Sequence, residues 1–248
     1  MRSRPRAVEE CGRTAQFPPM RILLVGLAVL PAFATAQTPP VSSYDGLRWE
    51  SVGPLRAGRA LAIAGSERRP HEYYAGLAGG GLWKTADGGT TWGPVTDGQI
   101  ASAAVGAVAV APSDPDVVYL GTGDPQWRGD HRTGDGVYRS SDGGRTWVHR
   151  GLPNAQTIAR IRVHPQDPDR VFVAVLGRPS EPSVERGVYR SRDGGVTWQQ
   201  VLFRSDSAGA IDLAIDPTDP EVLYAATWQV SRRPWRLWGG GQFSGLFK

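Results

Sequence analysis

Acidic, aromatic and arginine side chains gather in three irregular stretches: GTGDPQWRGDHRTGDG (121–136), LGRPSEPSVERG (176–187) and TWQVSRRPWRLWGGGQFSG (227–245). The first two contain the residues that could do acid–base chemistry: Asp124, Asp130, Asp135, Glu181 and Glu185. A glycosidase needs two carboxyl groups across one bond, roughly 5 to 10 Å apart. The residue types therefore suit cleavage of a sugar chain, while the sequence leaves the separation of the carboxyl groups open.

The same stretches also carry side chains that could hold a ligand without cutting it. Aromatic faces combined with arginine suit sugars or peptides, and loops carry function more often than frameworks do. The predicted ligand-binding residues are Trp127, Arg128, His131, Arg178, Arg186, Trp228, Arg232, Trp235 and Trp238. The alternative is that these residues pack the long loops against each other or against further parts of the fold.

A second set of acids lies in three glycine-rich segments, KTADGGTTW (84–92), RSSDGGRTW (139–147) and RSRDGGVTW (190–198). Their shared positions are Thr85, Asp87, Gly89, Thr91, Trp92; Ser140, Asp142, Gly144, Thr146, Trp147; and Ser191, Asp193, Gly195, Thr197, Trp198. Acidic and hydroxyl side chains accept hydrogen bonds from nearby backbone N–H groups in turns. Glycine supplies the left-handed backbone, and tryptophan can bury a large area between sheets. We interpret these acids as structural, because a turn uses all five residue types whereas catalysis would need one.

The spacing of these segments predicts a repeat. Their acids are 55 and 51 residues apart, a period typical of repeat architectures. The second and third are preceded by two short apolar runs around a Pro-x-Asp-Pro turn, as in IRVHPQDPDRVFVAVLG (161–177), and the first by a more divergent copy, LAIAGSERRPHEYYAG (61–76). Such runs, bounded by Gly, Pro and Asp, indicate strands. For the third unit we predict strands at 159–164, 170–175, 187–191 and 197–203. Four antiparallel strands per repeat predict an all-β fold, a β-propeller.

The motif Ser-x-Asp-x-Gly-x-Thr-Trp resembles the Asp-box of bacterial neuraminidase repeats, found in sialidases, xyloglucanase-type glycoside hydrolases and sortilin. Only Thr85 departs from it, and it keeps the hydroxyl. The resemblance covers 47–248 and is strongest to large secreted bacterial proteins described as sortilin-like or as xyloglucanase-like glycosyl hydrolases with such repeats. It implies that Ala78 stands where xyloglucanases carry a catalytic Asp. The sialidase Arg-Ile-Pro signature is missing, with Arg56 and Arg59 of PLRAGR as its nearest stand-in.

The repeat also sets the expected boundaries. We predict blades at about 56–95, 100–150 and 157–203, an incomplete blade at 208–248, and a separate outer strand at 47–53. About three and a half blades of four strands suggest a fragment of a larger propeller, with the rest supplied from outside this chain. The alternative is a four-bladed ring that Leu47–Gly53 completes.

The N-terminal residues look like a targeting segment. Residues 20–36 have one positive charge, an apolar run and Ala-Thr-Ala before Gln37, the layout of a signal peptide. We interpret 1–19 as a mis-called upstream extension and 37–46 as a linker, and we expect export to the periplasm or the exterior. Residues 1–36 hold the only cysteine and a net charge of +3, which leaves about +1 for the remainder. This balance argues against nucleic acid as a partner.

Strand direction decides which loops share a face. Strands alternate within a blade, so the Asp-boxes lie beside the Pro-x-Asp-Pro turns, and the loops between strands two and three lie opposite. We therefore predict an exported sortilin-like Asp-box propeller that binds a peptide, protein or glycan on the long-loop face, or acts as a scaffold. The alternative is a glycoside hydrolase using the loop carboxylates. No metal site is predicted, since the four histidines lack metal-ligand spacing. No cofactor and no membrane span after Gln37 are predicted either.

Overall fold

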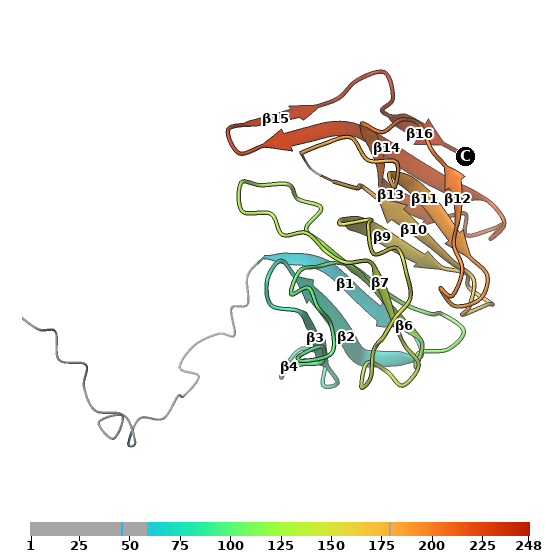
Figure 1. Ribbon diagram of the computed structural model, residues 1–248. Helices are drawn as coiled ribbons and strands as arrows, with labels where there is room; N and C mark the ends of the chain where they lie inside the picture. The colour runs from blue at the N-terminus through green and yellow to red at the C-terminus, as the bar shows by residue number, and fades with distance from the viewer. Residues whose placement is uncertain (1–45, 47–58, 179) are drawn as a thin grey trace, which may run out of the picture. The chain divides into compact units, whose positions relative to one another are not determined.

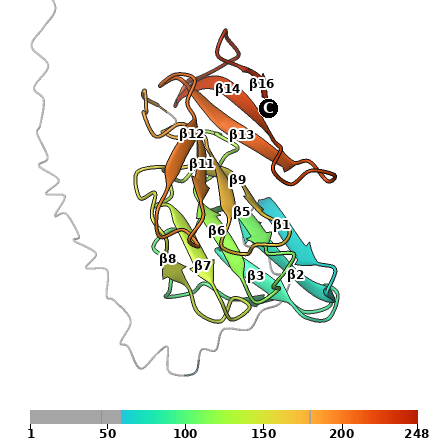
Figure 2. The same ribbon diagram turned by 90° about the vertical axis from the view of Figure 1, so that its right-hand side faces the viewer.

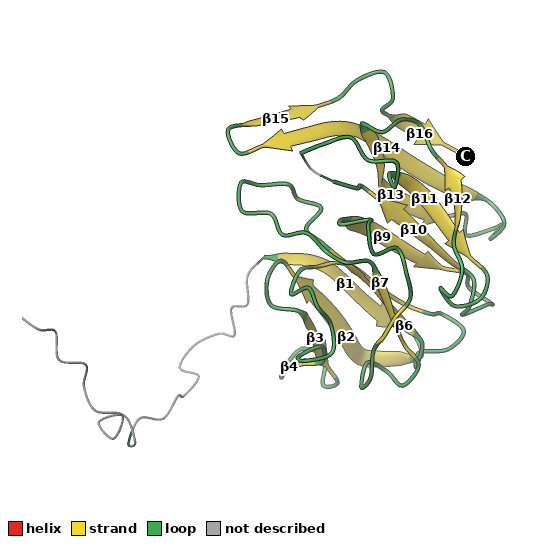
Figure 3. Ribbon diagram, in the orientation of Figure 1, coloured by secondary structure: helices red, strands yellow, loops and turns green. Residues whose placement is uncertain are grey.

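The described part of the chain is built from strands alone. The computed structural model describes Gly46, residues 59–178 and residues 180–248, so the predicted signal peptide and the outer strand 47–53 lie outside it. Within these residues sixteen strands form four four-stranded sheets, and neighbouring strands pair antiparallel (Figures 1 and 3). This confirms the predicted all-β fold of four-stranded antiparallel blades.

The first three sheets repeat one plan, in which four consecutive strands pair in chain order. They contain β1 (Ala60–Ser66), β2 (Arg69–Leu77), β3 (Leu82–Thr85) and β4 (Gly93–Pro94); β5 (Val105–Val110), β6 (Val118–Thr122), β7 (Val137–Ser140) and β8 (Val148–His149); and β9 (Ile158–Val163), β10 (Val171–Val175), β11 (Gly187–Ser191) and β12 (Gln199–Leu202). The strands predicted for the third unit match within about two residues at each end. The outer strands begin after the Asp-box tryptophan and not at it.

The fourth sheet departs from the plan. It contains β13 (Ala208–Ile215), β14 (Leu223–Arg233), β15 (Arg236–Gly239) and β16 (Gly245–Phe247). Strand β14 pairs with β16 near its start and with β15 near its end, so it bridges the sheet and a projecting hairpin. The expectation of one irregular loop over 227–245 is therefore wrong: residues 230–239 form a regular β-hairpin.

Burial shows where the core lies. The inner strands follow one another in space, with β5 between β1 and β9, and β9 next to β13 (Figure 2). Every residue of β6 and β10 is buried. Such strands are covered on both faces by neighbouring sheets, which explains their continuous apolar sequences in place of an alternating pattern.

Each inner strand carries an irregularity at the same point of the repeat. The pairing register shifts between Ala60 and Ala62 in β1, between Val105 and Ala107 in β5, and at the matching points of β9 and β13. At Gly106 a β-carbon would come within 2.3 Å of the Gly123 carbonyl oxygen, so only glycine fits there. Bulges bend a strand and re-aim its side chains.

The two ends of the sheets are different surfaces, as strand alternation requires. The second and third Asp-boxes are hydrogen-bonded to the first turn of their own sheet, and the first Asp-box is bonded to the start of β2 through the Gly88 amide and the His71 carbonyl. The Gly143 amide donates to the Asp116 carbonyl and the Gly194 amide to the Asp169 carbonyl, both at 2.9 Å. We call this end the Asp-box face. The opposite end, formed by the connections between second and third strands and by the links between sheets, is the loop face.

Candidate binding face

The connections on the loop face touch their neighbours from one sheet to the next. Arg132 lies against Gly79 of the first sheet, with its Nε 3.3 Å from where a β-carbon of Gly79 would stand. Gly129, on the same loop, lies similarly near the Arg232 guanidinium of the hairpin. Loop 121–136 and the β14–β15 hairpin project from the same side of the sheets (Figure 1). The loop face is therefore one connected surface.

Trp127 and Arg186 are buried beneath this surface and hold its loops together. Their exposed fractions are 4% and 1%, and the Arg186 guanidinium lies 5.5 Å from the centre of the Trp127 ring. Arg186 donates to the carbonyls of Arg178 (2.7 Å), Ser207 (3.0 Å) and Val230 (3.2 Å). Burial lowers the pKa of Arg186 to about 10.

These two residues were predicted to bind a ligand, and the structure places them in the interior, where they join loops from three sheets. Trp127 packs in a cluster with Leu176 and Val230, and its indole N–H donates to Thr157 Oγ1 at 3.4 Å. Their position matches the alternative stated for them, the packing of long loops on one another.

Two of the candidate carboxylates share one arginine. Arg59 contacts Asp124 at 2.5 Å and Asp130 at 3.2 Å. Asp124 is 1% exposed and also accepts from the Gln126 amide, so it ties the start of the loop to the first inner strand. The hydrogen bond from Arg59 lowers the pKa of Asp130. A general acid needs a raised pKa, so this environment favours a salt bridge over proton donation.

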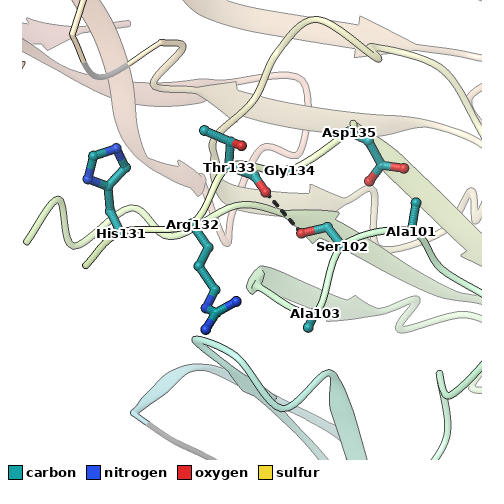
Figure 4. A pocket seen from close by; sticks show the side chains of 8 residues that line it. All are labelled: Ala101, Ser102, Ala103, His131, Arg132, Thr133, Gly134 and Asp135. Atoms are coloured by element: carbon teal, nitrogen blue, oxygen red, sulfur yellow. Dashed lines mark hydrogen bonds between the residues drawn. The ribbon is translucent and has the colours of Figure 1, made fainter. Parts of the chain in front are cut away.

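Asp135 lies at the edge of a hollow of about 490 Å³ (Figure 4). The hollow is lined by the inter-sheet link Ala101–Ala103 and by residues 131–135. The Asp135 carboxylate accepts from Tyr138 OH at 2.5 Å and from Thr122 Oγ1 at 3.1 Å. Ser102 Oγ donates to the Thr133 carbonyl at 3.0 Å and holds the two walls together.

A second hollow of about 430 Å³ adjoins the first, because Ala101 and Ala103 line both. Its other wall comes from the glycine loop 79–81, Trp83 and Asp97. The Trp83 indole N–H donates to the Gly80 carbonyl at 2.8 Å, which fixes the ring at the rim. Together the two hollows form a groove between the first and second sheets, which we call the inter-sheet groove.

The groove presents ionic groups that the fold does not use. Arg132 and Asp97 are both exposed. Within the described residues, no hydrogen bond or ion pair is formed by the side chain of either one. Arg132 points from its loop towards the first sheet (Figure 4). A planar arginine fork, a carboxylate and an indole around an open groove are groups that orient a polar ligand.

The remaining predicted residues lie elsewhere on the loop face. Arg178 is 3.9 Å from Glu181. Glu185 accepts from Ser183 Oγ at 2.7 Å. His131 lines the first hollow, and its Nδ1 lies 2.9 Å from the carbonyl of Arg128, whose own side chain is exposed. The structure therefore brings Asp135 and His131 to the groove, and leaves Glu181 and Glu185 on a separate loop.

The predicted hairpin residues divide into an anchor and an exposed tip. Trp228 packs under the hairpin, with its Cζ2 3.0 Å from where a β-carbon of Gly239 would be. Trp235 is 80% exposed and Trp238 43% exposed. Arg232 is partly buried and faces Gly129.

The Asp-box carboxylates on the opposite face are occupied by their own turns. Asp142 accepts from the Thr146 amide (2.9 Å), Thr146 Oγ1 (2.7 Å) and Ser140 Oγ (2.7 Å). The Asp87 and Asp193 carboxylates repeat this pattern. Hydrogen bonds from the threonine hydroxyls, above all, lower the pKa of each box acid to about 2. Gly144 adopts φ 86°, as a residue without a side chain can.

The five candidate carboxylates of the loop face each have a partner within the fold. Asp124 and Asp130 are ion-paired with Arg59, Asp135 and Glu185 accept hydrogen bonds from hydroxyl groups, and Glu181 lies 3.9 Å from Arg178. Ala78, in the place of the expected catalytic acid, is buried. Nowhere in the described ranges do three or more His, Cys, Asp or Glu gather as metal ligands would. Those ranges also hold no helix of the length and apolarity that a membrane crossing needs.

Sequence reasoning missed three residues of this face. Arg59 was considered only as a stand-in for a sialidase arginine, and Asp97 and Arg132 were not singled out. Asp97 lies in Thr-Asp-Gly, which reads as an ordinary turn. One signal in the sequence could have indicated Asp97 and Arg132: each follows a predicted strand in a connection on the loop face.

Known proteins with similar sequences are enzymes acting on xyloglucan. The chain is 31% identical over 140 residues to an oligoxyloglucan-reducing end-specific xyloglucanase of Emericella nidulans, covering 55% of this chain and 17% of that protein. It is 26% identical over 181 residues to xyloglucanase Xgh74A of Acetivibrio thermocellus, covering 64% and 20%. The chain thus spans about a fifth of the length of these curated relatives.

Solved structures show the same fold at lower identity. A GH74 enzyme of Niastella koreensis matches with a TM-score of 0.51 at 20% identity, over 68% of this chain and 26% of that one. An ancestral GH74 enzyme matches with a TM-score of 0.53 at 20% identity, over 71% and 22%. These likenesses support the fold.

The family comparison covers the central repeats. The family described as Sortilin-Vps10 (sortilin, neurotensin receptor 3) matches residues 80–205, just over half of the chain. That range includes all three Asp-boxes complete. The chain therefore belongs to the Sortilin-Vps10 family.

Proposed function

We propose that this chain is part of an exported propeller that binds a polysaccharide on its loop face and does not cleave it with its own carboxylates. The observation that carries the proposal is the inter-sheet groove, where Trp83, Asp97 and Arg132 surround two adjoining hollows. The predicted signal peptide at 20–36 supports export.

The groove suits a sugar chain for three physical reasons. It is open and extends over two hollows, which have Ala101 and Ala103 in common. An indole at its rim offers a flat apolar surface to a sugar ring. Trp83 and Asp135 are already fixed by internal hydrogen bonds. Binding a sugar therefore costs little side-chain entropy at these two residues. The named substrate of the relatives, xyloglucan, is such a chain.

The second candidate is a glycoside hydrolase, and the xyloglucanase relatives favour it. On this reading a carboxylate at the groove, Asp97 or Asp135, would work with a second carboxyl group from outside this chain. Two carboxyl groups across the bond are needed in either stereochemical mechanism. Hydrolysis that is lost on Asp97→Asn or Asp135→Asn separates this candidate from pure binding.

The test measures binding and cleavage together. The protein is titrated with xyloglucan oligosaccharides and a panel of plant and bacterial glycans by calorimetry, while reducing ends are counted. We expect binding without turnover, and a loss of about tenfold in affinity for Arg132→Ala or Asp97→Ala, since each removes a charged hydrogen-bonding group. Arg145→Ala is the matched control, because Arg145 is exposed on the Asp-box face.

Two results would count against the proposal. Equal affinity in the Arg132, Asp97 and Arg145 variants would remove the groove from the binding site. Binding only to peptides in a parallel panel would replace the polysaccharide with a peptide ligand.

A further inference from the structure

The β14–β15 hairpin places two arginines and an indole on one surface. The strands pair in register from Val230 to Arg233, with Ser231 opposite Trp238 and Arg233 opposite Arg236. Directly opposed residues of an antiparallel pair project to the same side, with β-carbons about 5 Å apart. Arg233, Arg236 and Trp238 therefore share one face of the hairpin.

This face carries an uncompensated like-charge pair. Like charges directly opposite each other destabilise a sheet, and Arg233 and Arg236 meet beside the two-residue turn Pro234-Trp235. In the described part of the chain, neither arginine forms an ion pair. The sequence offers no nearby counter-charge, because residues 222–248 contain four basic residues and no Asp or Glu.

The indole beside the pair is positioned and open. The Arg236 guanidinium lies 4.4 Å from the centre of the Trp238 ring, a cation–π contact that holds the two side chains together. Trp238 nevertheless keeps 43% of its surface exposed, and Trp235 at the turn keeps 80%. The guanidinium of Arg232 adds positive charge at the base of the hairpin, where it lies near Gly129.

We propose that this hairpin binds the carboxylate of an acidic sugar, so that the polysaccharide bound by the loop face is one containing uronic acids. The carboxylate lies between the Arg233 and Arg236 guanidiniums, and the sugar ring packs on Trp238. The inference rests on the proposed polysaccharide binding and names its substrate class. It follows from charge complementarity: a planar guanidinium fork matches a carboxylate in two parallel hydrogen bonds, and one anion relieves the repulsion between both arginines.

The test compares one sugar backbone with and without charge. Affinity is measured for polygalacturonate and for its fully methyl-esterified form, at about 20 mM and at 300 mM salt. We expect polygalacturonate to bind at least about tenfold more tightly than the ester at low salt, with most of the difference lost at high salt. Equal affinity for the two forms would overturn the inference.

Variants assign the effect to the hairpin. Arg233→Gln/Arg236→Gln is expected to remove the preference for polygalacturonate, and Trp238→Ala to weaken both forms. Arg145→Gln, an exposed arginine on the Asp-box face, should keep the preference. A preference that survives in the hairpin double variant would place the acidic subsite elsewhere and refute the assignment.

A last comparison separates this inference from the proposed function and from a membrane surface. Suppose that Arg132→Ala loses binding to neutral glycans and that the unchanged protein shows no preference for polygalacturonate over its ester. The proposed polysaccharide binding would then stand, and the proposed uronate site would be rejected. No binding to any glycan would reject both. Binding to vesicles containing phosphatidylglycerol, with none to polygalacturonate, would replace the uronate by a lipid headgroup and overturn the inference.

Discussion

The two faces of this propeller differ in how the fold uses their most prominent charged side chains. On the Asp-box face each box acid is enclosed by donors from its own turn, as Asp142 is by Thr146 and Ser140. On the loop face, Asp97, Arg132 and the Arg233–Arg236 pair are exposed and form no ion pair among the described residues. A charged group whose hydrogen bonds are made within the fold contributes to the free energy of unfolding. A charge that the fold leaves open is available to a ligand.

The largest test of this contrast concerns the box tryptophans. Trp147 is 8% exposed, packs among Tyr74 and Leu82 of the preceding sheet, and donates to the Val95 carbonyl at 2.9 Å. Trp147→Ala should lower the free energy of unfolding by about 3–5 kcal/mol, measured by denaturant titration. Trp92, at the same motif position, is only partly buried and donates within its own turn, so Trp92→Ala should cost less than half as much. Equal costs would show that the tryptophan stabilises its own turn and not the seam between sheets.

The next test removes one charge from each face. Asp142→Ala leaves the donors of Ser140 and Thr146 without their acceptor and should lower the free energy of unfolding by about 1–2 kcal/mol. Asp97→Ala should change it by less than about 0.5 kcal/mol, because its exposed carboxylate accepts no hydrogen bond from the part of the chain that the structure describes. Glycan affinity should show the reverse order. If Asp142→Ala keeps full stability and loses ligand binding, the division between the faces fails.

Much of the fold could be predicted because the Asp-box combines local and global information. Ser191, Asp193 and Gly195 form a turn through local hydrogen bonds, so their order is readable in the sequence. Their spacing then fixed the period, and the apolar runs between them placed the strands of the third sheet within about two residues. The hairpin was missed for a physical reason: its outward face is polar and cationic, so residues 230–239 lack the apolar alternation that indicates a strand.

The candidate site was less accessible to sequence reasoning. Whether Trp127 and Arg186 face a ligand or the interior depends on three loops from different sheets meeting, and no local pattern carries that contact. Asp97 lines one hollow of the groove and Arg132 the other, 35 positions apart in the chain, and the packing of the first sheet on the second brings the two hollows together.

Acid should weaken the Asp-box face selectively. The folded pKa of Asp87, Asp142 and Asp193 is about 2, below the value of about 3.9 for an unfolded Asp. Their contribution to stability is therefore present above about pH 4 and lost as the pH falls from 4 through 2. The melting temperature should fall over this window, and less steeply in a variant with all three changed to Asn. Parallel curves for the two proteins would show that other carboxylates, such as Asp130, carry the acid sensitivity.

The smallest effect has the opposite sign and belongs to the hairpin. Without ligand, Arg236→Gln should raise the free energy of unfolding by a few tenths of a kcal/mol, because it removes a like charge directly opposite Arg233. The loss of the contact with Trp238 works against this gain, so Arg233→Gln, which keeps that contact, should stabilise more. Saturating polygalacturonate should reverse the order and make the unchanged protein the most stable, since ligand binding to the folded state adds its own free energy. Differential scanning fluorimetry with and without polygalacturonate measures both. A hairpin that is destabilised by both substitutions in the absence of ligand would mean that the arginines are satisfied within the fold, as the box acids are.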